Sequence, residues 1–256
     1  MKLLVKKFFA SQLSTIIKNN LNYKIVSFNI KKLKNASVSD AFLWRTDNNF
    51  STIFKFNDLL KFLFKIDKSY VEIIFYDKNN KKIKQIIINK INYSNELLID
   101  SEFLDGLEDY GCFYIYHFTN QKTDINSILS NRCYLGYSKM NSIFSFVHGN
   151  GYARFKKINE QIAEDTNIVN TTFIKSHSYT IQKYFGCFEK HELFFTNPTS
   201  KIINFSIENK KFFLKSGSTI LVKIIKKEKV EIISNCLFFR PTVFSFNNNY
   251  FDVHHT

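Results

Sequence analysis

The sequence predicts an all-β protein, built as two tandem antiparallel sandwiches of the Ig-like or jelly-roll type with an N-terminal amphipathic helix. Short segments in which apolar and polar residues alternate recur along the chain, separated by turns rich in Asn, Asp and Lys. Aromatic residues make up 17% of the chain, with 29 Phe and 13 Tyr, and together with abundant Ile they favour strands over helices. At 256 residues the chain is long enough for one large domain or two small ones.

The N-terminal helix is predicted over residues 1–20, where apolar side chains recur at helical spacing between lysines. Leu4, Phe8 and Leu13 belong to this apolar stripe, which ends before Asn19-Asn20. We expect the stripe to pack against a sheet, because the opposite face mixes Ser, Gln, Thr and Lys. A helix that lies on a membrane surface is the alternative.

The first sandwich is predicted over residues 21–118. Its clearest hairpin joins Tyr70–Tyr76 to Lys82–Asn89 across an Asn-containing turn, because Asn tolerates the positive φ of tight turns. Asn57-Asp58 precedes the apolar run LLKFLFK, which predicts a short N-capped helix. No Gly or Pro occurs before Gly106, so we interpret this half as scaffold and not as a nucleotide-binding domain.

A connector with a helical turn at Asp124–Ser130 is predicted over residues 119–131, and the second sandwich over residues 132–256. The segment 71–89 resembles the segment 191–209. Each has a strand with an acidic residue and an aromatic end, then a polar turn, then an alternating Ile-containing strand. We interpret the likeness as two similar hairpins in two similar units.

The net charge of +14 comes mostly from Lys, since only four residues are Arg. Lys lacks the bidentate guanidinium fork that favours phosphate recognition, so we interpret the charge as solvated surface and do not expect specific nucleic-acid binding. The four cysteines are spread without a C-x-x-C pair, which predicts free thiols. No apolar run reaches the roughly 18 residues of a membrane span. We therefore expect a cytoplasmic protein without a transmembrane segment, metal site or cofactor.

The stretch Cys133–Phe155, CYLGYSKMNSIFSFVHGNGYARF, concentrates residue types that are scarce elsewhere in the chain. It holds three of the seven glycines and a run of aromatic residues. Glycines on both sides of Asn150 predict a loop that presents His148. A glycine hairpin turn with incidental polar residues is the alternative. The predicted ligand-binding residues are Tyr137, His148, Asn150, Tyr152 and Arg154.

Two further segments hold rare residues, Trp44-Arg45-Thr46-Asp47 and Phe239-Arg240-Pro241, and both are assigned structural roles. Arg45 and Asp47 are two residues apart, so on a strand they share one face and can form an ion pair. If the two units pack against each other, Trp44 or Arg45 has two possible places, at their interface or near the stretch Cys133–Phe155, and the sequence does not decide between them.

The function that these features favour is a non-catalytic binding module for a saccharide or related polar ligand, in cell-surface polysaccharide metabolism. Aromatic faces with Asn, Arg and His side chains suit stacking on sugars and hydrogen bonding to hydroxyls. One alternative is an enzyme in which His148 or His177 is the general base and Arg154 clamps an anion. A second alternative is a basic adaptor that binds nucleic acid or another protein.

Overall fold

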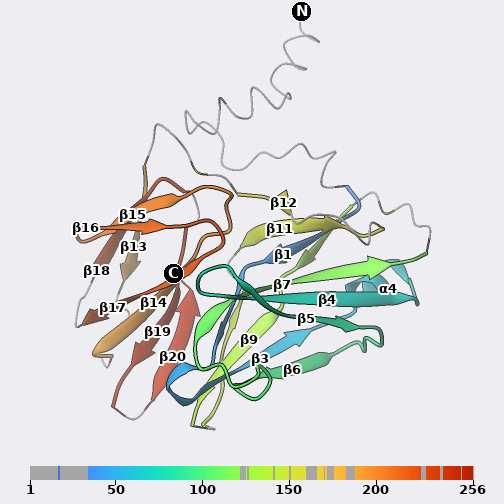
Figure 1. The fold of residues 1–256 in the computed structure, drawn as a ribbon, viewed down its shortest axis with the longest axis horizontal. Helices are drawn as coiled ribbons and strands as arrows, with labels where there is room; N and C mark the ends of the chain where they lie inside the picture. Colours follow the sequence, from blue (N-terminus) through green and yellow to red (C-terminus); the bar gives the residue numbers. More distant parts are fainter. Residues whose placement is uncertain are drawn as a thin grey trace, which may run out of the picture.

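The computed structural model describes residue 17 and residues 34–121, 125, 127–140, 142–149, 151–159, 166–169, 171, 176–182, 188–225, 229–236, 239–248 and 250–255 (Figure 1). This part of the chain confirms the all-β class: its twenty strands form five sheets of four strands each. The predicted N-terminal helix, apart from residue 17, lies outside the described residues.

Each sheet is named here after one of its strands, and the strands follow in spatial order. The β1 sheet contains β12 (Thr166–Asn167), β11 (Tyr152–Lys157), β1 (Ala36–Asp40) and β8 (Ile128–Asn131). The β7 sheet contains β2 (Phe42–Arg45), β7 (Tyr110–Thr119), β4 (Ser69–Asp77) and β5 (Lys82–Ile88). The β3 sheet contains β10 (Ser145–His148), β9 (Tyr134–Lys139), β3 (Phe50–Phe56) and β6 (Asn95–Ile99). The β15 sheet contains β13 (His177–Gln182), β18 (Lys229–Ser234), β15 (Ile203–Ile207) and β16 (Lys210–Leu214). The β14 sheet contains β17 (Thr219–Ile225), β14 (Lys190–Thr196), β19 (Thr242–Phe246) and β20 (Phe251–His255).

Two local predictions are confirmed. The helix α4 spans Leu59–Phe64, and its N-cap residue Asp58 accepts a hydrogen bond from the backbone N–H of Lys61. Strands β4 and β5 form the predicted hairpin, and Asn80 in its turn has a φ of 67°. Both features are short-range, so the local sequence is sufficient to specify them.

Strand β7 is the central strand of the fold, and it is buried along nearly its whole length. Phe113 and Ile115 face a large core shared with the β3 sheet. On the opposite face of the same strand, Tyr114 and Tyr116 pack against the β1 sheet. Because successive side chains of a strand point to opposite faces, one continuous apolar strand fills two cores.

The chain passes from the β1 sheet into the β7 sheet between β1 and β2. The hydroxyls of Ser37 and Ser39 accept hydrogen bonds from the backbone N–H groups of His117 and Ile115, at 2.8 and 3.0 Å. The side-chain amide of Asn131 donates to Ser37 Oγ at 3.0 Å. Strands β1 and β7 belong to different sheets, so these buried serine hydroxyls serve as hydrogen-bond acceptors for backbone N–H groups of β7.

The β14 sheet has a core on each face. Leu193 and Phe195 of β14 belong to a core with the β15 sheet, so these two sheets form a sandwich. Phe194, between them in the sequence, belongs to the large core with the β7 and β3 sheets. In Figure 1 the β15 and β14 sheets accordingly lie together on the left, with the β14 strands next to the strands of the first half.

The hydrogen-bonded ladders cross the predicted domain boundary at residue 132. Strand β9 pairs with β3, from Phe50 opposite Lys139 to Lys55 opposite Tyr134. Strand β11 pairs with β1 in the same way. Residues 134–157, which the sequence assigned to the second sandwich, thus complete the sheets of the first half. Strand pairing is set by long-range contacts, which a sequential pattern of alternation does not encode.

Two other predictions differ from the structure. The described part of the connector contains the strand β8, which pairs in parallel with β1 where a helical turn was predicted. Strands β14 and β15 do not form a hairpin like β4 and β5, because they lie in different sheets. Buried Asn197 holds the link between them, since its amide donates to the carbonyls of Lys201 and Leu214.

None of the helices in the described residues has the length and apolar character needed to cross a membrane.

Candidate ligand-binding face

The outward face of the β3 sheet carries much of the stretch Cys133–Phe155. Along β9 and β10, Leu135, Tyr137 and Val147 point into the large core. The residues between them point outward, as the alternation of a strand requires. These outward residues include Tyr134, Gly136, Phe146 and His148, and the neighbouring strands β3 and β6 add Ile53, Lys55, Glu96 and Leu98. We call these eight residues the β3 face.

Phe146 belongs to the edge strand β10 of the β3 face, and its ring lies over Gly136 of the neighbouring strand β9. It is directly opposite Gly136 on β9, and Gly136 is opposite Ile53 on β3. A Cβ atom at Gly136 would lie 2.6 Å from a ring carbon of Phe146 and 2.6 Å from Cγ2 of Ile53. The missing side chain therefore lets the Phe146 ring lie against the backbone of the neighbouring strand, while 45% of the residue remains exposed.

A second row of the β3 face adds polar groups beside this ring. His148 is opposite Tyr134, Tyr134 is opposite Lys55, and Lys55 is opposite Glu96. Lys55 Nζ lies 2.7 Å from Glu96 Oε1 and 5.2 Å from the centroid of the Phe146 ring. Tyr134 is 60% exposed. The face thus combines two accessible aromatic rings with hydrogen-bond donors and acceptors, which suits stacking on the apolar face of a sugar ring.

Tyr137, the first predicted site residue, is a core residue in the structure. It is fully buried, and its hydroxyl donates to the carbonyl of Leu43 at 2.8 Å. Its ring packs edge-on against Phe244, with the centroids 4.7 Å apart. Burial raises the pKa of the Tyr137 hydroxyl, so this group stays neutral. The register of β9 turns Tyr137 inward and leaves Tyr134 outside.

Arg154 is also buried, on the side of β11 that faces the β7 sheet. Its guanidinium carbon lies 4.5 Å from the Tyr114 ring centroid and 5.6 Å from that of Tyr76. Two residues along, Lys156 pairs with Glu72 at 2.7 Å. Arg154 therefore contributes to the packing of the β1 sheet on the β7 sheet and is not part of the β3 face.

Asn150 lies outside the described residues, as does the side chain of Tyr152, whose backbone belongs to β11. Beside them, Gly149 lies tightly against Asp40, because a Cβ at Gly149 would be 2.5 Å from Asp40 Cβ. Asp40 is fully buried, and desolvation raises the pKa of its carboxyl to about 6, although nearby Arg132 opposes the shift.

Among the predicted site residues whose side chains the structure describes, His148 is the exposed one. Its ring centroid is 4.9 Å from that of His255, and His255 Nε2 bonds the carbonyl of His148. Burial lowers the pKa of His255 to about 4, although the hydrogen bond to the His148 backbone opposes the shift. His191 and His254 both bond the hydroxyl of Ser245 instead. Within the described residues, no three His, Cys, Asp or Glu side chains form a group that could hold a metal ion.

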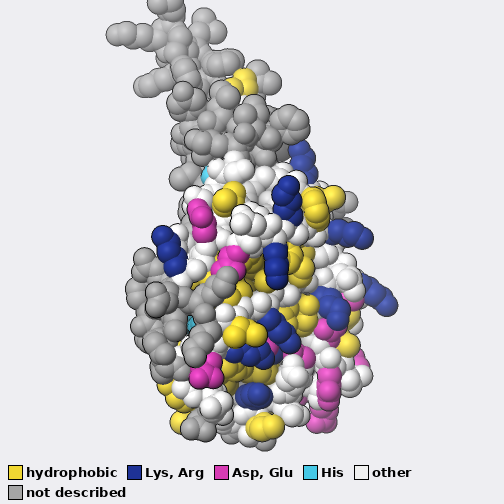
Figure 2. All heavy atoms as spheres, turned by 90° about the vertical axis from the view of Figure 1, so that its left-hand side faces the viewer, with side chains coloured by type: hydrophobic (Ala, Val, Ile, Leu, Met, Phe, Trp, Pro, Cys, Tyr) yellow, Lys and Arg dark blue, Asp and Glu magenta, His cyan; other side chains and the backbone are white. Residues whose placement is uncertain are grey.

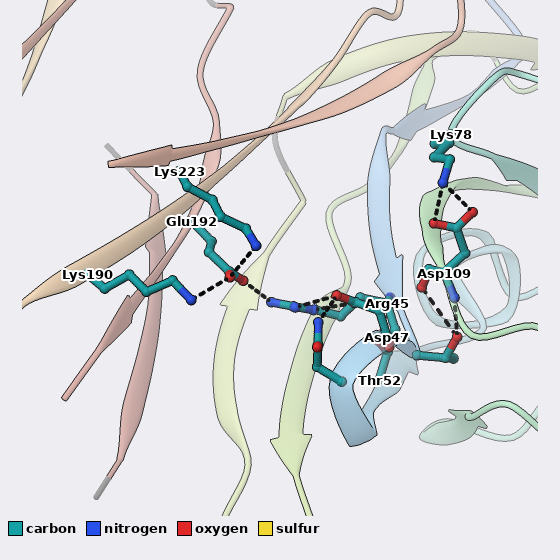
Figure 3. A network of polar contacts seen from close by, with 10 residues as sticks. Arg45, Asp47, Thr52, Lys78, Asp109, Lys190, Glu192 and Lys223 are labelled. Carbon is teal, nitrogen blue, oxygen red and sulfur yellow. Dashed lines mark hydrogen bonds and ion pairs between the residues drawn. The ribbon is translucent and has the colours of Figure 1, made fainter. Parts of the chain in front are cut away.

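The most buried charges lie elsewhere, at the contact between the two halves of the chain (Figure 3). Arg45 pairs with Asp47 at 2.9 Å, as the sequence predicted, and with Glu192 of β14 at 3.1 Å. The guanidinium carbon lies 3.7 Å from the centroid of Phe50 and 4.6 Å from that of Phe244. Since the Arg45 side chain is fully buried, we assign this network to stability and not to ligand binding.

Of the eight residues of the β3 face, His148 alone is among the predicted ligand-binding residues. Tyr134, Gly136 and Phe146 lie within the stretch that the sequence interpretation singled out. The other four, Ile53, Lys55, Glu96 and Leu98, lie outside it. Alternation in β3 and β6 predicts that they share one outward face within each strand. It does not show that these strands lie beside β9. Searches against protein-family models and against curated proteins both end without a match for this chain.

Proposed function

We propose that the chain is a non-catalytic binding module for a saccharide or related polar ligand, and that the β3 face is its binding surface. One observation carries the proposal. The Phe146 ring lies against Gly136 with 45% of the residue exposed, beside Tyr134 with 60% exposed. Large aromatic side chains that remain accessible on an ordered sheet are ready to stack on a ligand at little entropic cost.

The polar groups of the face support a saccharide as the ligand. Lys55 and Glu96 form an ion pair at 2.7 Å, so the face offers donors and acceptors without a large excess of one charge. Tyr134 and His148 add further hydrogen-bonding groups close to the Phe146 ring. Sugars present alternating hydroxyls and apolar C–H surfaces, and both find partners here.

Binding is favoured over catalysis because the strongest acid–base groups are inaccessible. The carboxyl of Asp40, with its pKa raised to about 6, is fully buried, and so is the Arg45 network. A general base must reach the substrate within hydrogen-bond distance. Cytoplasmic residence is part of the proposal, and it is supported by the free thiols of Cys112, Cys133 and Cys236.

A glycan array followed by calorimetry on its hits tests the proposal. We expect wild-type protein to bind a saccharide, and we expect Tyr134→Ala and Phe146→Ala each to weaken the affinity about tenfold, or about 1.4 kcal/mol. Phe62→Ala is the matched control, because Phe62 is 59% exposed but lies on α4. An array without hits, or both variants binding as tightly as Phe62→Ala, would overturn the proposal.

A further inference from the structure

The outward face of the β15 sheet contains a hollow of about 640 Å³. Its lining includes residues of β15, β16 and β18, on the side of the sheet opposite its sandwich core. Figure 2 views the molecule from the side of the β15 and β14 sheets, and there Lys and Arg side chains are scattered around exposed apolar side chains. A volume of this size is within the range of sites for small organic ligands.

An exposed aromatic ring forms part of the hollow. Phe213 of β16 is 71% exposed, whereas its neighbour Phe212 stacks on buried Phe205 with the ring centroids 5.0 Å apart. Ile233 of β18 adds a second apolar side chain that is 39% exposed. A Phe side chain that remains in water forgoes the free energy of burial, and a bound ligand could recover part of it.

The charges of the hollow have a single sign. Lys201 and Lys211 are its charged lining residues among those that the structure describes, and both are exposed. Asn204 and Ser206 of β15 also line the hollow, and their uncharged side chains can form hydrogen bonds. Asn204 is opposite Phe213, and Ser206 is opposite Lys211, so the aromatic ring, the polar groups and a cation occupy two adjacent rows.

We infer that this hollow is a second binding site, and that its ligand is an acidic saccharide, a sugar that carries carboxylate groups. The exposed Phe213 ring would stack on the sugar, Asn204 and Ser206 would bond its hydroxyls, and Lys201 and Lys211 would pair with its carboxylates. The balanced Lys55–Glu96 pair of the β3 face gives no such preference for an anion. The inference extends the proposed function to a separate set of residues, so either can fail while the other stands.

Titration with trigalacturonate, followed by nuclear magnetic resonance and calorimetry, tests the inference. The methyl ester of the same trisaccharide is the matched ligand, because it keeps the sugar rings and removes the charge. We expect the acid to bind at least tenfold more tightly than the ester, and its affinity to fall as salt is raised. Equal binding of acid and ester, or no binding of the acid, would overturn the inference.

Four variants locate the site. We expect Phe213→Ala and Lys211→Gln each to reduce the affinity for trigalacturonate about tenfold. Exposed Lys90 is far from the hollow in the sequence and does not line it, so Lys90→Gln should bind as wild type does. Phe146→Ala should also bind normally. If Phe146→Ala loses the acidic sugar while Phe213→Ala retains it, the hollow is excluded and the β3 face remains supported. Unchanged melting temperatures show that the variants are folded.

Discussion

Two ion pairs of this protein each join a basic side chain to a glutamate, but they lie in opposite surroundings. Arg45 and Glu192 lie 3.1 Å apart with side chains 0% and 5% exposed, and Lys55 and Glu96 lie 2.7 Å apart with side chains 38% and 53% exposed. Both cations also lie near Phe rings, Arg45 on Phe50 and Lys55 on Phe146. Both pairs thus combine a basic residue, a glutamate and a nearby Phe ring, and they differ in burial and in the cation, which is Arg in one and Lys in the other.

The comparison shows that burial decides what such a group does. The Arg45 side chain is not exposed to solvent, so its guanidinium depends on Asp47 and Glu192 for its hydrogen bonds and links β2 to β14. Around Lys55, water remains, so the pair adds little to stability and its groups stay available to a ligand. The buried pair therefore holds the two halves together, and the exposed pair belongs to a surface.

Removal of the buried carboxylate is the largest expected effect. We predict that Glu192→Ala lowers the free energy of unfolding by about 3–5 kcal/mol, because it leaves the Arg45 charge buried with one partner fewer. Urea denaturation measures the change. A loss below about 1 kcal/mol would show that Asp47 alone compensates Arg45, and would remove the link between halves that we assign to Glu192.

The second test concerns Asp40, whose carboxyl is also buried but lies farther from a cation than the carboxyl of Glu192 does. The folded pKa of Asp40, about 6, lies above its ordinary value of 3.8, so the folded state binds a proton between these values that the unfolded state releases. The contribution of Asp40 to the free energy of unfolding therefore falls as the pH rises from about 4 to 6. Asp40→Asn does not titrate. We therefore predict that the free energy of unfolding of Asp40→Asn, relative to that of wild type, increases by up to about 3 kcal/mol over this pH range. Each pKa unit corresponds to about 1.4 kcal/mol.

Denaturation of Asp40→Asn and wild type at several pH values measures this difference. Asp105→Asn is the control, because the Asp105 side chain is 79% exposed and its ion pair with Lys84 is on the surface. The difference in the free energy of unfolding between Asp105→Asn and wild type should stay small from pH 4 to 7. A flat difference for Asp40→Asn as well would contradict the assignment of a desolvated carboxyl.

The exposed pair gives the smallest expected effect. We predict that Glu96→Ala changes the free energy of unfolding by less than about 1 kcal/mol, since exposed ion pairs are screened by water and salt. The same urea measurement as for Glu192→Ala makes the two pairs directly comparable. A loss of 3 kcal/mol or more would place the Lys55–Glu96 pair with the structural network, and the division between buried and exposed pairs would fail.

The sequence predicted the features that depend on neighbours in the chain. The α4 helix and the β4–β5 hairpin are set within a few residues, by capping and turn chemistry. The predicted Arg45–Asp47 pair also forms, but not along a strand, because β2 ends at Arg45 and Asp47 begins a 3-10 helix. The stretch Cys133–Phe155 was singled out for its run of aromatic residues, and in the structure two of them, Tyr134 and Phe146, are exposed. Neither of these two was among the predicted ligand-binding residues.

What the sequence could not supply is which side of each strand meets the core. Tyr134 and Tyr137 lie three residues apart in one strand, so they point to opposite faces, and composition does not show which one is buried. The same uncertainty applied to Arg154. In the structure its guanidinium packs against the ring of Tyr114 on β7. A shift of register by one residue would exchange the two faces.

The sequence by itself therefore determined the strand-rich class and the local turns and caps. Only the tertiary structure decided that β9 joins β3, that Arg45 meets Glu192 across 147 residues of sequence, and that Phe146 rests on Gly136. The physical reason is the range of the interactions. Propensity and turn chemistry act between neighbours, whereas strand pairing and charge burial depend on residues that only the folded chain brings together.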